Sequence, residues 1–171
     1  MKFQKESEVS TIYLKPGEVC FSKSPVKIVT VLGSCVSIIM YSKSCRVGAI
    51  CHAVMPSREA AMTKQRLKDA FQYVDSSMEW MLSQFEEAGI KRDAIEVKIF
   101  GGSEIFFDNS KKSSIGVGKK NIDAAIRMIK HKNLKLKAWN IGGNKGRKLI
   151  FYTDTGEVLT KFVSKEMNLS V

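Results

Sequence analysis

The first third of the chain alternates between short apolar runs and polar turns, which is the pattern of β-strands. The runs are rich in β-branched residues, and pairs such as Pro16-Gly17, Ser24-Pro25 and Gly33-Ser34 separate them. Strands are therefore predicted at residues 11–14, 19–21, 26–32, 36–41 and 47–55. The stretches 36–40 and 47–55 are apolar almost throughout, which predicts strands covered on both faces.

A helical period replaces this pattern from about residue 64. Apolar residues recur at spacings of three and four up to residue 88, and Gly89 follows as a C-cap, so one long helix is predicted over 64–88. Its predicted inward positions are Leu67, Ala70, Phe71, Val74, Met78, Met81, Leu82 and Phe85. This spacing favours a stripe facing the core over a methionine-rich groove for a partner.

The rest of the chain combines strands with one more helix. The second helix is expected over about 119–132, and its predicted inward positions are Ile122, Ala125, Ile126 and Ile129. Strands are expected at 95–100, 134–141, 148–152 and 158–163, the last two joined by a hairpin around Asp154-Thr155-Gly156. The segment 109–118, rich in Ser, Lys and Gly, is expected to be a loop.

Length and composition favour one globular domain. The chain has 171 residues, of which 44% are apolar and 26% charged, and it contains no repeat or linker. We therefore expect a single domain over residues 1–171, in which about residues 1–9 form a flexible N-terminal tail. No apolar stretch reaches the roughly 18 residues of a transmembrane helix, and the polar N-terminus has no signal-peptide core. A cytoplasmic protein without membrane insertion is expected.

The formal net charge of +11 predicts either an acidic partner or a solvated basic surface. Basic residues are densest at 111–112, 119–120 and 127–148. Nucleic acid, an anionic membrane surface and an acidic protein are the partners that such a surface attracts. Few aromatic residues lie among the lysines, so a stacking platform for single-stranded nucleic acid is poorly supported and no nucleic-acid partner is predicted.

Four cysteines, Cys20, Cys35, Cys45 and Cys51, lie within the first 51 residues. Free thiols are expected, because the chain carries no secretion signal. The spacing of these cysteines fits no closed structural zinc site, and the glycine-rich stretches at 116–118 and 142–148 match no phosphate-binding fingerprint. Neither pattern therefore favours a metal or phosphate site, and the acyl chemistry considered next requires no metal and no cofactor.

One of the cysteines is a candidate nucleophile. Cys35 follows the tight turn Gly33-Ser34 between two apolar runs, and His52 lies in the next run. Two adjacent strands would bring the thiol and the imidazole together. A thiol beside an imidazole is the minimum requirement for covalent acyl chemistry, since the imidazole accepts the thiol proton when the sulfur attacks a carbonyl carbon.

Further motifs accompany this pair in a fixed order. They are TVLGSCV at 30–36, VGA at 47–49 followed by His52 and Met55-Pro56, KIFGG at 98–102, the stretch 115–121, and IGGNKGR at 141–147 ahead of Thr155-Gly156. With this set, the chain resembles the CheD family over about residues 10–165. A lone Gly-Ser-Cys would not be specific, whereas the ordered set is.

The resemblance implies a fold, an activity and a set of partners. The fold is α+β, a β-sandwich of mixed sheets flanked by outer helices, shared in outline with bacterial toxins that deamidate glutamines of GTPases. The activity is that of a protein-glutamine glutaminase, a hydrolase that converts glutamine side chains of methyl-accepting chemotaxis receptors to glutamate without a cofactor. The implied partners are these chemoreceptors and, in organisms that have one, a CheC-type phosphatase. The implied location is the cytoplasm, at receptor arrays.

The resemblance also implies a catalytic set, which falls on Cys35, His52 and Thr30. We expect His52 either to take the thiol proton or to hold a thiolate–imidazolium pair, with a thioester intermediate and release of ammonia. Thr30 would orient the imidazole through its hydroxyl or its backbone carbonyl. The backbone N–H groups of the turn formed by Gly33, Ser34 and Cys35 are suited to stabilise the oxyanion.

Two other functions stay open at this level. With a vestigial Cys35 site, the chain would act as a docking module for receptors or for the phosphatase. If the positive charge alone selected the partner, the chain would bind nucleic acid without sequence preference. Phe106 and Phe107 either rim a partner surface or pack in the core.

Overall fold

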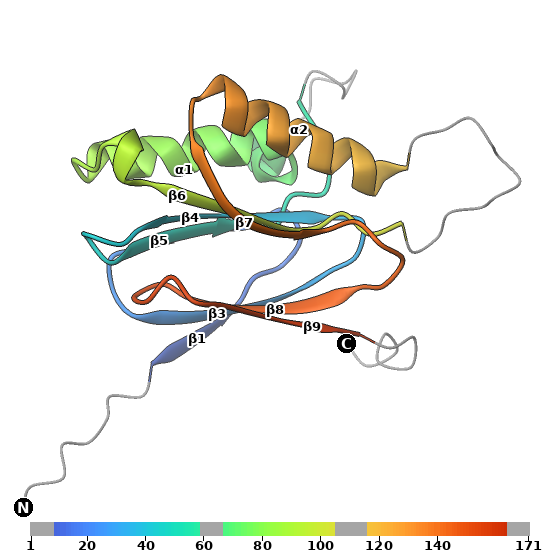
Figure 1. Ribbon diagram of the computed structural model, residues 1–171, viewed down its shortest axis with the longest axis horizontal. Coiled ribbons are helices and arrows are strands. Elements are labelled where there is room, and N and C mark those ends of the chain that lie inside the picture. Colours follow the sequence, from blue (N-terminus) through green and yellow to red (C-terminus); the bar gives the residue numbers. More distant parts are fainter. Residues whose placement is uncertain (1–8, 59–66, 105–115, 164–171) are drawn as a thin grey trace, which may run out of the picture.

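The computed structural model describes residues 9–58, 67–104 and 116–163, which form two stacked sheets with helices on one side (Figure 1). The strands are β1 (Ser10–Tyr13), β2 (Val19–Ser22), β3 (Val26–Leu32), β4 (Val36–Ser42), β5 (Val47–Cys51), β6 (Glu96–Gly101), β7 (Lys135–Ile141), β8 (Arg147–Tyr152) and β9 (Val158–Phe162). The helical segments are the 3-10 helices η1 (Leu67–Gln72) and η2 (Arg92–Ala94) and the α-helices α1 (Val74–Glu87) and α2 (Val117–His131).

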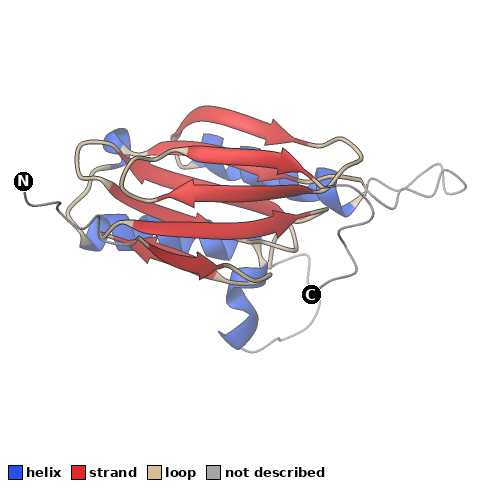
Figure 2. Cartoon of the chain, turned by 90° about the horizontal axis from the view of Figure 1, so that it is seen from below, coloured by secondary structure: helices blue, strands red, loops and turns tan. Residues whose placement is uncertain are grey.

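Both sheets are mixed. The four-stranded sheet has the order β1-β3-β8-β9, in which β1 and β3 run parallel. The five-stranded sheet has the order β2-β5-β4-β6-β7, in which β6 and β7 run parallel and α2 makes the crossover between them. Seen from below, the four-stranded sheet lies in front and the helices lie behind it (Figure 2). The predicted α+β sandwich with outer helices is confirmed.

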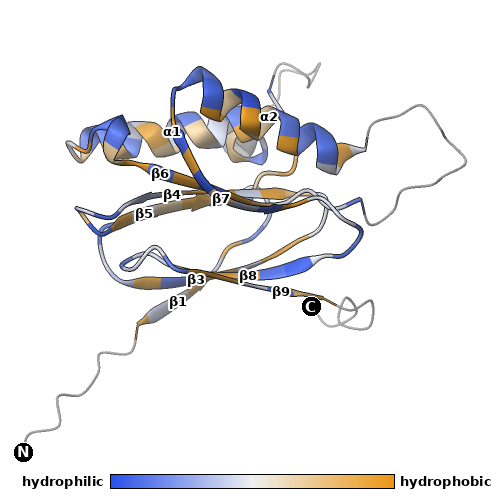
Figure 3. Cartoon of the chain, in the orientation of Figure 1, coloured by the Kyte–Doolittle hydropathy of each residue, from blue (hydrophilic) through white to orange (hydrophobic). Residues whose placement is uncertain are grey.

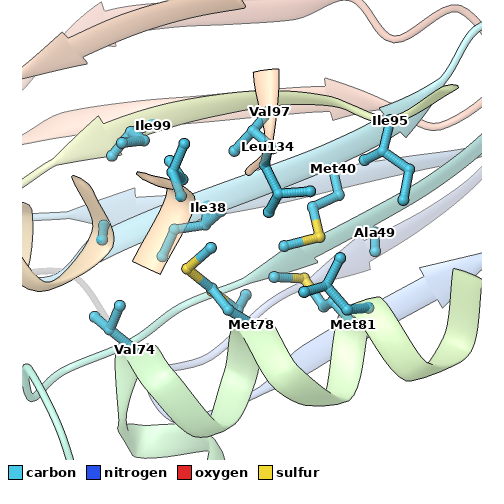
Figure 4. Close-up of a cluster of buried hydrophobic side chains, with 14 of the residues drawn as sticks. Ile38, Met40, Ala49, Val74, Met78, Met81, Ile95, Val97, Ile99 and Leu134 are labelled. Carbon is cyan, nitrogen blue, oxygen red and sulfur yellow. The ribbon is translucent and has the colours of Figure 1, made fainter. Parts of the chain in front are cut away.

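The five-stranded sheet is the middle layer, which explains its apolar strands. Every residue of β4 and β5 is buried. One core lies between this sheet and the helices, where Met78 and Met81 of α1 lie over Ile38 and Met40 of β4 (Figure 4). A second core, built mainly from β3, β4, β5 and β8, lies between the two sheets. The prediction that these strands are covered on both faces is confirmed.

The predicted helix over 64–88 is wrong at its beginning. α1 begins at Val74, residues 67–72 form the separate helix η1, and residues 64–66 lie outside the described residues. Between η1 and α1, Tyr73 is extended, with φ −100° and ψ 139°. The backbone N–H groups of Val54 and Met55 donate to Gln72 O, and the N–H of Val74 donates to Met55 O. These hydrogen bonds hold Tyr73 in the extended conformation. Tertiary pairing overrides the helical period of the sequence here.

The predicted strand over 47–55 is too long, because β5 ends at Cys51. Beyond that point Ala53 forms an isolated bridge with Val36, and Met55 forms another with Tyr73. The apolar run continues to Met55, but at that residue the backbone pairs with Tyr73 and no longer with β4. The other predicted strands agree with the observed ones to within one residue at each end.

The buried face of α2 agrees with the predicted one at Ile122, Ala125 and Ile129 and differs from it at Ile126. Its buried residues are Gly118, Asn121, Ala124, Ala125 and Ile129, whereas Ile126 is 41% exposed. Hydropathy favours isoleucine over asparagine as an inward residue, and the polar Asn121 takes an inward position instead. Figure 3 shows hydrophobic and hydrophilic residues alternating along both helices.

The predicted loop over 109–118 falls mostly outside the described residues, as do Phe106, Phe107, Lys111 and Lys112. Its last two residues, 117 and 118, open α2 instead of ending the loop. Within the described ranges, neither α-helix has the length and apolar character to cross a membrane.

Candidate active site

Residues 33–35 carry the chain from one sheet to the other. β3 ends at Leu32 in the four-stranded sheet, and β4 begins at Val36 in the five-stranded sheet. Cys35 therefore lies at one end of the sandwich, where it is half-buried against the core between the sheets.

All three carbonyl groups of this turn accept hydrogen bonds from other parts of the chain. The donors are the Ser103 backbone N–H to Gly33 O (2.8 Å), Asn121 Nδ2 to Ser34 O (3.0 Å) and the Gly102 backbone N–H to Cys35 O (2.8 Å). These bonds fix the peptide planes, so the turn is a rigid support for the thiol. In the described part of the chain, the backbone N–H of Ser34 has no acceptor.

Two glycines at the end of β6 let the backbone approach this closely. Gly101 and Gly102 have φ of +101° and +69°, which disfavours any side chain. A Cβ on Gly101 would also clash with the Cys35 carbonyl oxygen. The KIFGG motif therefore has a structural role at the site, which is to hold the turn at van der Waals distance.

We expect Gly101→Ala to destabilise the fold by about 3 kcal/mol, from a strained φ and a displaced Cys35 carbonyl. Urea unfolding measures the loss. Gly89→Ala is the matched control, since Gly89 has φ +73° and a Cβ added there would meet nothing within 4 Å. The control should lose only the roughly 1–2 kcal/mol of backbone strain. Equal losses in the two variants would contradict the importance of the close approach.

A single β-bridge relates Cys35 to His52. Val36 and Ala53 exchange two backbone hydrogen bonds of 2.9 Å, and both side chains face the core beneath the helices. Successive residues of a strand face opposite sides, so Cys35 and His52 both face away from that core, toward the other sheet. They are diagonal neighbours across the bridge, and the Cα atoms of such neighbours lie ~7–8 Å apart, within reach of their side chains.

His52 is held in one tautomer. Its side chain is buried, and Nδ1 lies 2.7 Å from the hydroxyl oxygen of Thr30. That hydroxyl donates its only proton to the Leu14 carbonyl oxygen, at 2.8 Å. It must therefore accept from the imidazole, so Nδ1 carries the proton and Nε2 of the neutral ring is free to act as a base.

The surroundings favour the neutral forms of both groups. Burial lowers the pKa of His52 to about 4, although the Leu14 carbonyl and the Glu18 carboxylate act in the opposite direction. Burial also raises the pKa of the Cys35 thiol, and its own backbone N–H offsets part of that rise. Of the two expected forms, these shifts favour the neutral thiol and neutral imidazole over the ion pair.

This protonation state is testable by thiolate absorbance in the ultraviolet. The difference spectrum between the wild type and Cys35→Ala should show no thiolate at neutral pH, because burial disfavours the charged form. The thiolate should appear only at alkaline pH, above the ordinary range of a thiol. A full thiolate signal at neutral pH would instead establish the ion pair.

The structure thus brings Thr30 and His52 into contact and places Cys35 on the same side of the bridge, next to Gly33 and Ser34. Two further groups belong to the site but were not among the predicted site residues. They are the Leu14 carbonyl and the Asn121 side chain. A backbone carbonyl leaves no signal in a sequence. Asn121 does leave one, because it ends the fourth motif of the chain.

The other cysteines lie apart from this pair. All four cysteines are free thiols. Cys51 adjoins His52 but faces the opposite core, where burial raises its pKa to about 12. Among the described residues, no group of three or more His, Cys, Asp and Glu side chains is arranged to hold a metal ion. A cavity of about 560 Å³ lies between the first turn of α1 and the second half of α2, and neither Cys35 nor His52 lines it.

Comparison with known proteins gives consistent matches. The family model of CheD, described as chemotactic sensory transduction, matches residues 54–162. The chain is 43% identical over 154 residues to the probable chemoreceptor glutamine deamidase CheD 2 of Geobacter sulfurreducens, which covers 90% of this chain and 91% of that protein.

Two further relatives carry a similar name. The chain is 36% identical over 167 residues to the probable chemoreceptor glutamine deamidase CheD of Maridesulfovibrio salexigens, covering 96% of this chain and 98% of the relative. It is 34% identical over 148 residues to the protein of that name from Methanococcus maripaludis, covering 86% and 92%. These alignments extend over most of the chain, including regions ahead of residue 54.

Proposed function

This chain belongs to the CheD family, and on that premise we propose that it deamidates glutamine side chains of chemoreceptors through a covalent intermediate on Cys35. The names of its relatives supply the reaction and the class of substrate. The observation that carries the proposal is the buried Thr30–His52 hydrogen bond, which leaves Nε2 as a free base on the side of the Val36–Ala53 bridge that Cys35 also faces.

In the first half of the reaction, Nε2 of His52 accepts the thiol proton as Cys35 Sγ attacks the carbon of the substrate carboxamide. A C–S bond forms and the carbonyl oxygen becomes an oxyanion. The Ser34 N–H is available as a donor to this oxyanion, and one such donor is worth about 3 kcal/mol in other acyl-transfer enzymes. The imidazolium then protonates the amide nitrogen, and the C–N bond breaks. Ammonia departs, and the substrate remains bonded to Cys35 as a thioester.

In the second half, water attacks the thioester carbon while Nε2 accepts its proton. The C–S bond breaks, and the sulfur recovers a proton from the imidazolium. The product is a glutamate side chain. A neutral resting pair suits this scheme, because the imidazole is ready to accept a proton from the thiol and later from water.

The substrate is proposed to be the cytoplasmic part of a methyl-accepting receptor, reached at receptor arrays. Receptor methylation regions carry Glu and Gln pairs, and the net charge of +11 favours association with such an acidic surface. A CheC-type phosphatase is the further partner that we propose, where the organism has one.

Mass spectrometry of a receptor cytoplasmic fragment tests the proposal. The wild-type protein should convert mapped glutamines to glutamates, each with the mass gain of an amide-to-acid change, and should release ammonia in equal amount. A fragment in which those glutamines are already glutamates is the control. Receptor binding without any conversion would replace the deamidase with the docking module.

We expect Thr30→Val to lower kcat by about 10- to 100-fold, because the variant removes the acceptor that holds the Nδ1–H tautomer. Thr30→Ser keeps the hydroxyl and should retain most of the activity. Initial rates of ammonia release from the receptor fragment measure both variants. Equal activities of Thr30→Val and the wild type would show that the Thr30 hydroxyl does not orient the ring.

A further inference from the structure

Asn121 lies in the first half of α2, and its side chain is fully buried. Both amide protons are used. Nδ2 donates to Ser34 O at 3.0 Å and to Val54 O at 2.9 Å. Ser34 directly precedes Cys35, and Val54 lies two residues beyond His52. One side chain from a helix therefore ties together the two segments that carry the thiol and the imidazole.

The backbone itself provides only one bridge between these segments. Val36 and Ala53 exchange two hydrogen bonds. The next bonded pair of an antiparallel ladder would join Ser34 to Met55. That pair does not form, because the Met55 N–H donates to Gln72 O and the Met55 carbonyl accepts from Val74. The ladder thus ends beside Cys35, where the two segments separate.

The Asn121 amide occupies the place of the missing pair. Its two bonds reach one carbonyl on each segment, just beyond the last backbone bridge. Asn121 Oδ1 is buried and has no partner among the described residues. A buried amide normally satisfies both of its ends, so this arrangement costs free energy that packing alone does not require. What the side chain contributes here is its two donated hydrogen bonds.

We propose that Asn121 is a positioning residue that sets the alignment of Cys35 with His52. The inference rests on the proposed Cys35–His52 chemistry and deepens it. Without the amide, one bridge would hold two segments that already diverge, and the thiol could move relative to Nε2. A displacement of about 1 Å costs on the order of 100-fold in rate when reacting groups must be aligned.

The test uses Asn121→Ala and Asn121→Ser, each with and without His52→Ala. Serine keeps one hydroxyl donor, so it can satisfy one carbonyl and should fold even if the alanine variant fails to fold. Two quantities are measured: kcat and KM for the receptor fragment, and the rate of Cys35 alkylation by iodoacetamide near neutral pH, resolved by site with mass spectrometry. Ile129→Ala, a buried change further along α2, is the control for general destabilisation.

Asn121→Ala is expected to lower kcat by about 100-fold with KM changed less than about threefold, and Asn121→Ser should lie between it and the wild type. Cys35 alkylation should slow by about tenfold when His52 is present, because His52 takes the thiol proton during attack. In the His52→Ala background, Asn121→Ala should change alkylation by less than about twofold. Ile129→Ala should leave both quantities near the wild-type values.

Unchanged rates in a folded Asn121 variant would overturn the proposal. Equal slowing of alkylation with and without His52 would also overturn it, since Asn121 would then act on the turn alone. Alkylation needs no receptor substrate. A wild-type protein that does not deamidate would therefore refute the proposed function, while the alkylation cycle would still decide whether Asn121 aligns the pair.

Discussion

Replacing Cys35 with alanine is expected to abolish glutamine conversion in the receptor fragment. In the proposed mechanism this sulfur bonds to the substrate carbon. Cys51 faces the opposite core, and Cys45 lies in the exposed turn at the far end of β4, so neither thiol can replace it. Triad enzymes that lose their nucleophile fall by about 10⁶-fold. Mass spectrometry of the fragment measures the loss.

Cys20→Ala is the matched control for this experiment. Cys20 is also half-buried, burial also raises the pKa of its thiol, and it packs against the same core between the sheets. Its removal should change activity by less than about twofold, because β2 lies away from the turn. If Cys35→Ala retained wild-type activity, or if both variants lost it equally, Cys35 would not be the nucleophile.

His52→Gln is expected to lower kcat by about 10²- to 10⁴-fold, the usual contribution of a general base. Glutamine approximates the size of the ring and can still donate to Thr30 Oγ1, so packing is largely kept while the base is lost. Ammonia release under saturating receptor fragment measures kcat. An activity within about threefold of the wild type would assign the base to another group.

The same variant should change the pH dependence of stability. The pKa of His52 is lowered from 6.5 to about 4 on folding, so the unfolded chain binds a proton before the folded one does. Stability from this residue is therefore complete above pH 6.5 and is lost as the pH falls toward 4. The loss amounts to about 3 kcal/mol. Urea unfolding of the wild type should show it, and unfolding of His52→Gln should not.

The layers of the fold follow from local hydrophobic patterns. β4 and β5 are apolar on both faces because they form the middle layer, and the amphipathic period of α1 matches its contact with that layer. The patterns fail where tertiary pairing takes precedence. The pairing of Met55 with the segment around Tyr73 ends the strand early and delays α1 to Val74.

Residue types alone were sufficient to predict nearly all strands and the candidates Cys35 and His52. The ordered motifs predicted the family, and the family resemblance in turn implied the α+β class and Thr30. These depend on local periodicity and on motifs, which can be read along the chain. The tautomer of His52, the effect of burial on its pKa, the anchoring of the turn by residues 102 and 103, and the inward place of Asn121 emerged from the folded chain. Each of these depends on backbone carbonyls and N–H groups, which nearly every residue shares, or on burial produced by segments distant in the chain. Local patterns carry no information about either.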